Sequence, residues 1–131
     1  MKKHILLVDD DIDELKIFMD ALEEVPGSYK CTYAPNADQA VSMLKYIHPH
    51  YIFIDYNLPG MNGIDLLAEV KKDRGLQEVP VYLYSTTINT ETKRLAAFLG
   101  AAGSIEKPSS VGMMRSVLRN VLVTSNVGMA S

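Results

Sequence analysis

Short apolar runs alternate along this chain with longer segments whose apolar residues recur at helical spacing, and this alternation limits the folds it can adopt. The candidate strands, of which the second is weaker and the last is short, lie at residues 5–8, 29–34, 51–54, 81–84 and 103–106. Nearly continuous apolar strands are typical of a parallel sheet buried on both faces. Because crossovers between parallel strands are right-handed, the sheet should be doubly wound. We therefore expect an α/β fold with five parallel strands and helices on both faces.

Local signals also place the ends of the helices, since Asp, Asn and Ser favour helix starts while Pro and Gly favour stops. The expected helices run from Asp11 or Asp13 to Pro26, from the cap Asn36 to Ile47, from Ile64 to Lys72, from about Thr90 to Leu99, and from Ser109 or Ser110 to about Val123. The 131 residues have the length of one domain. We expect that domain over residues 1–123 and a frayed tail over residues 124–131.

The composition argues against several classes of function. A formal net charge of -3 leaves no basic surface for a phosphate backbone, so we expect no direct nucleic-acid binding. No window approaches the length of a membrane span, so we expect no membrane partner and a cytoplasmic location. The sequence after Val123 is too short for an effector domain, which favours a stand-alone domain that acts through another protein. A piece cut from a larger protein would look the same.

Polar side chains follow four of the expected strands at the point where each strand ends. They are Asp9 and Asp10 after the first strand, Asp55 after the third, Ser85 and Thr86 after the fourth, and Lys107 after the fifth. Ligand chemistry in a doubly wound sheet gathers at the carboxyl ends of the strands. We therefore expect three acids, two hydroxyls and one ammonium to converge at one edge. A solvated acidic turn that caps the next helix is the simpler alternative for the acidic run.

This set of groups suits phosphoryl transfer. Clustered carboxylates recruit a hard divalent cation, which we expect to be Mg²⁺ with Mn²⁺ as a substitute. The cation and Lys107 would offset phosphoryl charge, and a hydroxyl would donate to a phosphoryl oxygen. Asp55 is the candidate nucleophile for an aspartyl phosphate, because it stands alone while Asp9 and Asp10 are paired and better placed as metal ligands. Alternatively, Asp55 only caps the turn before Pro59.

In their order and spacing these motifs resemble the receiver domains of two-component response regulators, from Lys3 to about Leu122. The motifs are Val8-Asp9-Asp10, Asp55 with Asn57-Leu58-Pro59-Gly60 and Asn62-Gly63, Ser85-Thr86, and Lys107-Pro108. The resemblance is strongest to stand-alone regulators of the chemotaxis type. It implies a flavodoxin-like fold with strand order 2-1-3-4-5.

The resemblance also implies a role for each site residue. Asp55 would accept a phosphoryl group from a histidine kinase or a histidine phosphotransfer protein. Mg²⁺ would be bound by the side chains of Asp10 and Asp55, by the backbone carbonyl of Asn57, and by Asp9 through water. Ser85 would donate to the phosphoryl group, Lys107 would pair with it, and the Lys107–Pro108 peptide would be cis.

The same family suggests how the domain would act. It would be a phosphoacceptor with self-catalysed transfer and autodephosphorylation rather than an ordinary enzyme. Phosphorylation would change the surface that an unknown downstream protein binds, with the domain a monomer or a phosphorylation-dependent dimer. The fourth helix, fifth strand and fifth helix commonly form that surface in the family.

Two positions depart from the family pattern. Ser104 stands where many receivers carry the aromatic residue that turns inward on activation, so that switch is in doubt here. Tyr84 is a candidate replacement, although a residue on the sheet face is the simpler interpretation. Thr86 stands where many receivers have Ala or Gly, and its side chain could crowd the approach of water or of the phosphodonor.

Other functions fit the sequence less well. A phosphohydrolase of the haloacid dehalogenase type would use Asp9 as its nucleophile, but no later acidic pair completes its metal site and nothing resembles a cap. A docking module that works without phosphorylation would make the acidic site vestigial. An FMN-binding flavodoxin would need a Gly-rich or Ser-rich phosphate loop after the first strand, where this chain is acidic.

Overall fold

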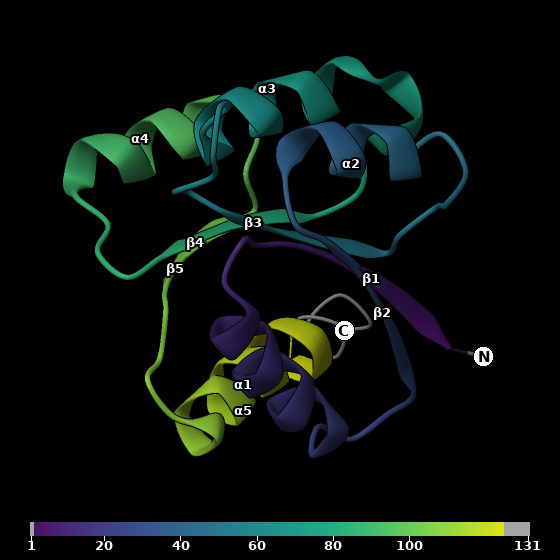
Figure 1. The fold of residues 1–131 in the computed structure, drawn as a ribbon, viewed down its shortest axis with the longest axis vertical. Coiled ribbons are helices and arrows are strands. Elements are labelled where there is room, and N and C mark those ends of the chain that lie inside the picture. Colours follow the sequence, from purple (N-terminus) through teal and green to yellow (C-terminus); the bar gives the residue numbers. More distant parts are fainter. Residues whose placement is uncertain (1, 125–131) are drawn as a thin grey trace.

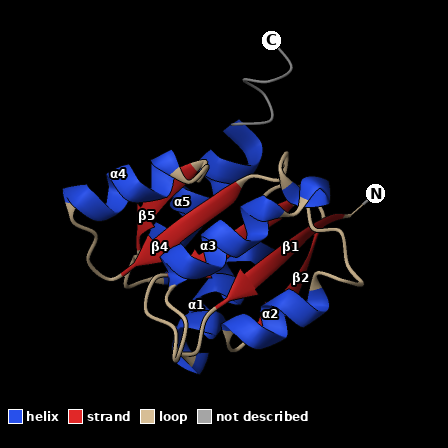
Figure 2. Ribbon diagram, turned by 90° about the horizontal axis from the view of Figure 1, so that it is seen from above, coloured by secondary structure: helices blue, strands red, loops and turns tan. Residues whose placement is uncertain are grey.

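The computed structural model of this chain describes residues 2–124, and its centre is a five-stranded parallel sheet. The strands are β1 (Lys3–Val8), β2 (Tyr29–Ala34), β3 (Tyr51–Asp55), β4 (Val81–Ser85) and β5 (Gly103–Glu106). Their order in the sheet is β2-β1-β3-β4-β5. The arrowheads of β1 and β4 point the same way in Figure 2, as parallel pairing requires. The predicted fold class and strand order are confirmed.

Helices cover both faces of the sheet. They are α1 (Ile12–Glu23), α2 (Ala37–Met43), α3 (Gly63–Lys72), α4 (Thr90–Phe98) and α5 (Val111–Arg119), with a 3₁₀ turn at Arg74–Leu76 and a π-helical turn at Asn120–Thr124. Figure 1 shows α1 and α5 together on one face and α2, α3 and α4 on the other. No helix within residues 2–124 is long and apolar enough to cross a lipid bilayer.

Each α-helix begins behind a side chain that accepts a hydrogen bond from the backbone of the first turn. These N-cap residues are Asp11, Asn36, Asn62, Asn89 and Ser110. The structure thus selects Asp11 over Asp13 and Ser110 over Ser109. The second helix was expected to reach Ile47 but ends at Met43, and turns formed by the backbone N–H groups of residues 45–47 follow it. The tail predicted to fray lies beyond the described residues except for Thr124.

The core lies in two layers, one on each face of the sheet. Alternate residues of one strand enter different layers, so Leu6 lies under α2, α3 and α4 while Leu7 lies under α1 and α5. Every residue of β3 is buried. A strand packed on both sides has little freedom to shift, and the residue at its carboxyl end is therefore held in a well-defined position.

Candidate functional site

The strand register brings the predicted site residues to one edge of the sheet. Val8 on β1 pairs with Ile54 on β3, so Asp9 follows directly beside Asp55. On the other side of β3, Asp55 pairs with Tyr84, and Ser85 comes next along β4. The backbone N–H of Lys107 donates to the carbonyl of Ser85 at 2.8 Å, which places the start of the Lys107 side chain at the same edge.

The ammonium of Lys107 lies between three carboxylates. Its Nζ is 3.1 Å from Oδ2 of Asp55 and 3.4 Å from Oδ2 of Asp9, and it forms an ion pair with Oε2 of Glu14. The Lys107 side chain is only 7% exposed. These carboxylates raise the pKa of Lys107 even though burial opposes the charge. When all four groups are ionised, two negative charges remain uncompensated in the cluster.

Asp55 is buried at the end of β3, with 3% of its surface exposed. Its Oδ1 accepts the backbone N–H of Asn57 at 3.0 Å, while its Oδ2 is the oxygen that faces Lys107. Burial raises the pKa of Asp55 to about 6, against the opposing effects of the Asn57 N–H and of Lys107. At neutral pH the carboxylate is therefore mostly ionised, as a nucleophile must be.

Asp9 is fully buried and is held through both of its oxygens. Oδ1 accepts the backbone N–H of Asp11 at 2.9 Å, and Oδ2 accepts the hydroxyl of Tyr84 at 2.6 Å. The Tyr84 ring also lies under Lys107, with Nζ 4.6 Å from the ring centroid. The simpler interpretation of Tyr84 as a sheet-face residue was incomplete, because its polar end reaches the site.

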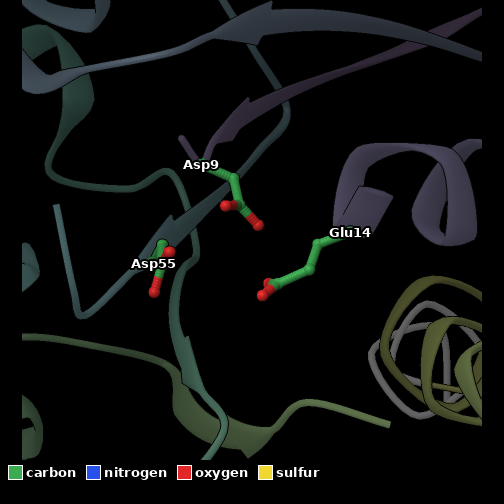
Figure 3. A group of neighbouring side chains, drawn as sticks. All are labelled: Asp9, Glu14 and Asp55. Atoms are coloured by element: carbon green, nitrogen blue, oxygen red, sulfur yellow. The ribbon is translucent and has the colours of Figure 1, made fainter. Parts of the chain in front are cut away.

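Sequence reasoning missed Glu14, which lies in the first turn of α1. Figure 3 shows its side chain reaching from the helix toward Asp9 and Asp55 at the strand ends. One carboxylate oxygen from each of these three residues lies within 4.8 Å of the others. Burial raises the pKa of Glu14, and Lys107 opposes that shift. The spacing Asp11-x-x-Glu14 resembles a capping box, so sequence alone would assign Glu14 to the helix start rather than to the site.

The remaining predicted residues surround this cluster. The open cleft above it is lined by Asp10, Asp11, Ile12, Glu14, Asp55, Asn57, Thr86 and Lys107. Asp10 is exposed and does not belong to the group of three carboxylates, so its predicted place as a metal ligand stays a prediction. The same holds for the carbonyl of Asn57, whose described contacts are made by its nitrogens.

Ser85, the last residue of β4, and Thr86, which follows it, differ in their surroundings. Ser85 is buried, and its Oγ lies 3.5 Å from Nδ2 of Asn57. Thr86 is exposed at the rim of the cleft. Ser104 is half-buried and lines a depression beside α4, away from the carboxylates. Residues 2–124 contain no cis peptide bond, so the expected cis Lys107–Pro108 peptide is wrong, although the Lys107 N–H still donates to Ser85.

The donor set fits a hard divalent cation. Asp9, Glu14 and Asp55 offer only carboxylate oxygens, which Mg²⁺ prefers, and the cluster keeps a negative charge even with Lys107 present. Softer metals favour sulfur or imidazole ligands, and this group of three residues contains neither. These residues, with Asp10 at the rim, could therefore hold Mg²⁺ or Mn²⁺.

Comparison with known proteins gives one consistent family. The sequence model of one protein family, the response regulator receiver domain, matches residues 5–119. The phosphate regulon transcriptional regulatory protein PhoB of Pseudomonas aeruginosa is 31% identical over 121 residues, covering 89% of this chain and 52% of that protein. The chemotaxis protein CheY-3 of Vibrio cholerae is 31% identical over 117 residues, covering 89% of each chain. The chain thus spans about half of the length of PhoB and most of CheY-3.

Solved structures agree on the fold. The Mn²⁺-bound form of the response regulator Rcp1 superposes with a TM-score of 0.85 at 22% identity, covering 93% of this chain and 96% of Rcp1. The chemotaxis response regulator CheY4 of Vibrio cholerae superposes with a TM-score of 0.82 at 23% identity, covering 93% of this chain and all of that one.

Proposed function

Because this chain belongs to the response regulator receiver domain family, we propose that Asp55 accepts a phosphoryl group from a histidine kinase or a histidine phosphotransfer protein. Receiver domains are phosphoacceptor signalling domains rather than classical enzymes. The observation that carries the assignment to Asp55 is its contact with Lys107, 3.1 Å from Oδ2, at the base of an open cleft. A buried acceptor beside a single ammonium can receive a phosphoryl group whose charge that ammonium offsets.

The proposed transfer forms one bond and breaks one. A carboxylate oxygen of Asp55 attacks phosphorus, while the bond from phosphorus to the donor histidine nitrogen breaks and its electron pair stays on that nitrogen. The N–H of Asn57 holds Oδ1 at 3.0 Å and so limits rotation of the carboxylate. Lys107 then pairs with a phosphoryl oxygen, and Ser85 donates its hydroxyl proton to another.

Bound Mg²⁺ or Mn²⁺ would supply charge neutralisation at the phosphoryl oxygens. We assign its binding to Asp9, Asp10 and Asp55 with the carbonyl of Asn57, as the family resemblance implies. We add Glu14, because its carboxylate reaches the same cluster. Thr86 at the rim would limit the access of water and of small phosphodonors.

The proposed output is a change of the surface that a partner protein binds. The names of the relatives place receiver domains both in chemotaxis and in transcriptional regulation. We infer that this domain likewise acts through a protein partner, as a monomer or as a phosphorylation-dependent dimer, with no direct nucleic-acid or membrane contact. The net charge of -3 supports this part of the proposal, and a cytoplasmic location accords with it.

Intact-mass spectrometry after incubation with acetyl phosphate and Mg²⁺ tests the assignment. We expect one phosphoryl adduct on the wild type, and we expect EDTA or the substitution Asp55→Asn to abolish it. An adduct that survives Asp55→Asn but disappears in Asp9→Asn would instead place the nucleophile where a phosphohydrolase has it. No adduct with acetyl phosphate or with the smaller donor phosphoramidate would favour a docking module that works without phosphorylation.

A further inference from the structure

Tyr84 is a buried aromatic residue to which the proposed transfer assigns no role. It precedes Ser85 on β4 and is 1% exposed. The register pairs it with Asp55 on β3, and its ring packs in the core layer beneath α1 and α5. A buried phenol hydroxyl requires a hydrogen-bond partner, and the partner of Tyr84 is a residue of the site.

The side chain makes two polar contacts, one with each sign of charge in the site. Its hydroxyl donates to Oδ2 of Asp9 at 2.6 Å, and Nζ of Lys107 lies over its ring, 4.6 Å from the centroid. Short hydrogen bonds to a carboxylate are among the stronger ones in proteins. An ammonium above an aromatic face is attracted by the negative face of the ring. Burial and the nearby charge of Asp9 raise the pKa of Tyr84, so its hydroxyl keeps the proton that it donates.

We propose that Tyr84 is a positioning residue of this receiver site, with a hydroxyl that orients Asp9 for metal binding and a ring that orients Lys107 toward the phosphoryl group. The inference rests on the proposed function. Asp9 has its other oxygen fixed by the N–H of Asp11, so the Tyr84 hydroxyl completes the orientation of the carboxylate. The two contacts come from different parts of one side chain, so the hydroxyl contact can be removed while the ring contact is kept.

Tyr84→Phe removes the hydroxyl and keeps the ring. Partners that orient a metal ligand change metal affinity by about 10- to 100-fold when they are lost. We expect isothermal titration calorimetry to show a dissociation constant for Mg²⁺ raised about tenfold. Adduct formation from acetyl phosphate should then fall at limiting Mg²⁺ and be recovered by excess Mg²⁺.

Tyr84→Leu removes the hydroxyl and the ring together. We expect weaker Mg²⁺ binding and, in addition, slow adduct formation that excess Mg²⁺ does not recover, because Lys107 has lost the ring that holds it. Thermal unfolding in EDTA checks that each variant is folded. If Tyr84→Leu does not fold, the metal titration of Tyr84→Phe still tests the proposal.

Tyr82→Phe is the matched control, since it removes a phenol hydroxyl from the same strand at a position whose ring stacks on Phe53. We expect its Mg²⁺ affinity to equal that of the wild type. A Tyr84→Phe dissociation constant within about twofold of the wild-type value, or an equal rise in Tyr82→Phe, would overturn the proposal. Weaker Mg²⁺ binding in Tyr84→Phe without any adduct on wild-type Asp55 would support the role of Tyr84 and reject the phosphoacceptor role.

Discussion

Gly63 packs directly against the backbone of Asp55: a Cβ atom on residue 63 would lie 2.5 Å from the Asp55 carbonyl oxygen and 2.8 Å from the Cα of Tyr56. The backbone N–H of Gly63 also donates to the carbonyl of Tyr56 at 2.8 Å. The start of α3 therefore supports the segment that carries the proposed phosphoacceptor. Backbone atoms cannot move aside as a flexible side chain can, so residue 63 has no room for a side chain.

Gly63→Ala should destabilise the domain by about 1–3 kcal/mol, the usual cost of overpacking. Gly112→Ala is the control, because a Cβ at this helical position meets nothing within 4 Å. That change should be neutral or stabilise by up to about 1 kcal/mol, since Ala favours a helix over Gly. Urea denaturation measures both free energies of unfolding. Equal midpoints for the two variants would contradict the close packing at Gly63.

Asp55→Asn should stabilise the folded domain at pH 7.5 in EDTA. The pKa of Asp55 is raised to about 6, so the folded state favours the protonated form, and stability falls as the pH rises from about 4 to above 6. Asn cannot ionise, so the variant does not lose this stability as the pH rises. We expect the difference in free energy of unfolding to be about 1–3 kcal/mol, at 1.36 kcal/mol per pKa unit. Added Mg²⁺ should reduce the difference in free energy of unfolding between Asp55→Asn and the wild type, since the cation stabilises the ionised carboxylate of the wild type.

Thermal or urea unfolding at pH 4.0 and pH 7.5 measures this effect, with the exposed Asp10→Asn as a control of the same charge change. Asp55→Asn should be more stable than the wild type at pH 7.5 and nearly equal to it in stability at pH 4.0. An advantage that does not depend on pH would show that the ionisation of Asp55 is not its source.

Glu14→Gln should weaken Mg²⁺ binding. The carboxylate of Glu14 belongs to the group whose oxygens lie within 4.8 Å, and its loss removes one negative charge near the cation. Two unit charges about 4 Å apart in water interact by about 1 kcal/mol, so a divalent ion would lose about 2 kcal/mol and the dissociation constant should rise about 30-fold. Glu24→Gln is the control, because Glu24 pairs with Arg115 on the surface, at 3.0 Å. Calorimetric titration that finds no difference between the two variants would remove Glu14 from the metal site.

Lys107→Met should destabilise the domain strongly at neutral pH. It leaves the buried carboxylates of Asp9 and Asp55 without their cation, and breaking a buried ion pair from one side costs about 3–5 kcal/mol. We expect a loss of at least about 2 kcal/mol at pH 7.5, with a smaller loss at pH 5, where Asp55 protonates.

Lys72→Met provides the comparison for Lys107→Met, since the Lys72–Glu69 pair is exposed on α3. Exposed pairs contribute little, so the loss should stay below about 1 kcal/mol. If urea denaturation showed that both substitutions lower the free energy of unfolding by similar amounts, Lys107 would not be the cation that balances the buried acids.

Local patterns were sufficient to predict much of this molecule. Apolar runs marked the strands, Asn36 marked one helix start, and the pair Ser109 and Ser110 bracketed another, because a cap depends on residues only a few positions away. The meeting of Asp9, Asp55 and Lys107 was also predictable, since parallel strands end at a common edge whatever their order.

The sequence by itself therefore determined the α/β class, the helix starts to within about two residues and the edge at which the acids gather, because these depend on local periodicity, capping and parallel strand direction. Only the tertiary structure decided that Glu14 and Tyr84 join the site and that Asp10 faces solvent. Glu14 reaches the cluster because the first turn of α1 lies beside the carboxyl ends of β1 and β3. Tyr84 reaches Asp9 because the register of β4 against β3 sets it level with Asp55. Long-range packing sets the placement of α1 and the register of β4, and no short stretch of sequence contains them.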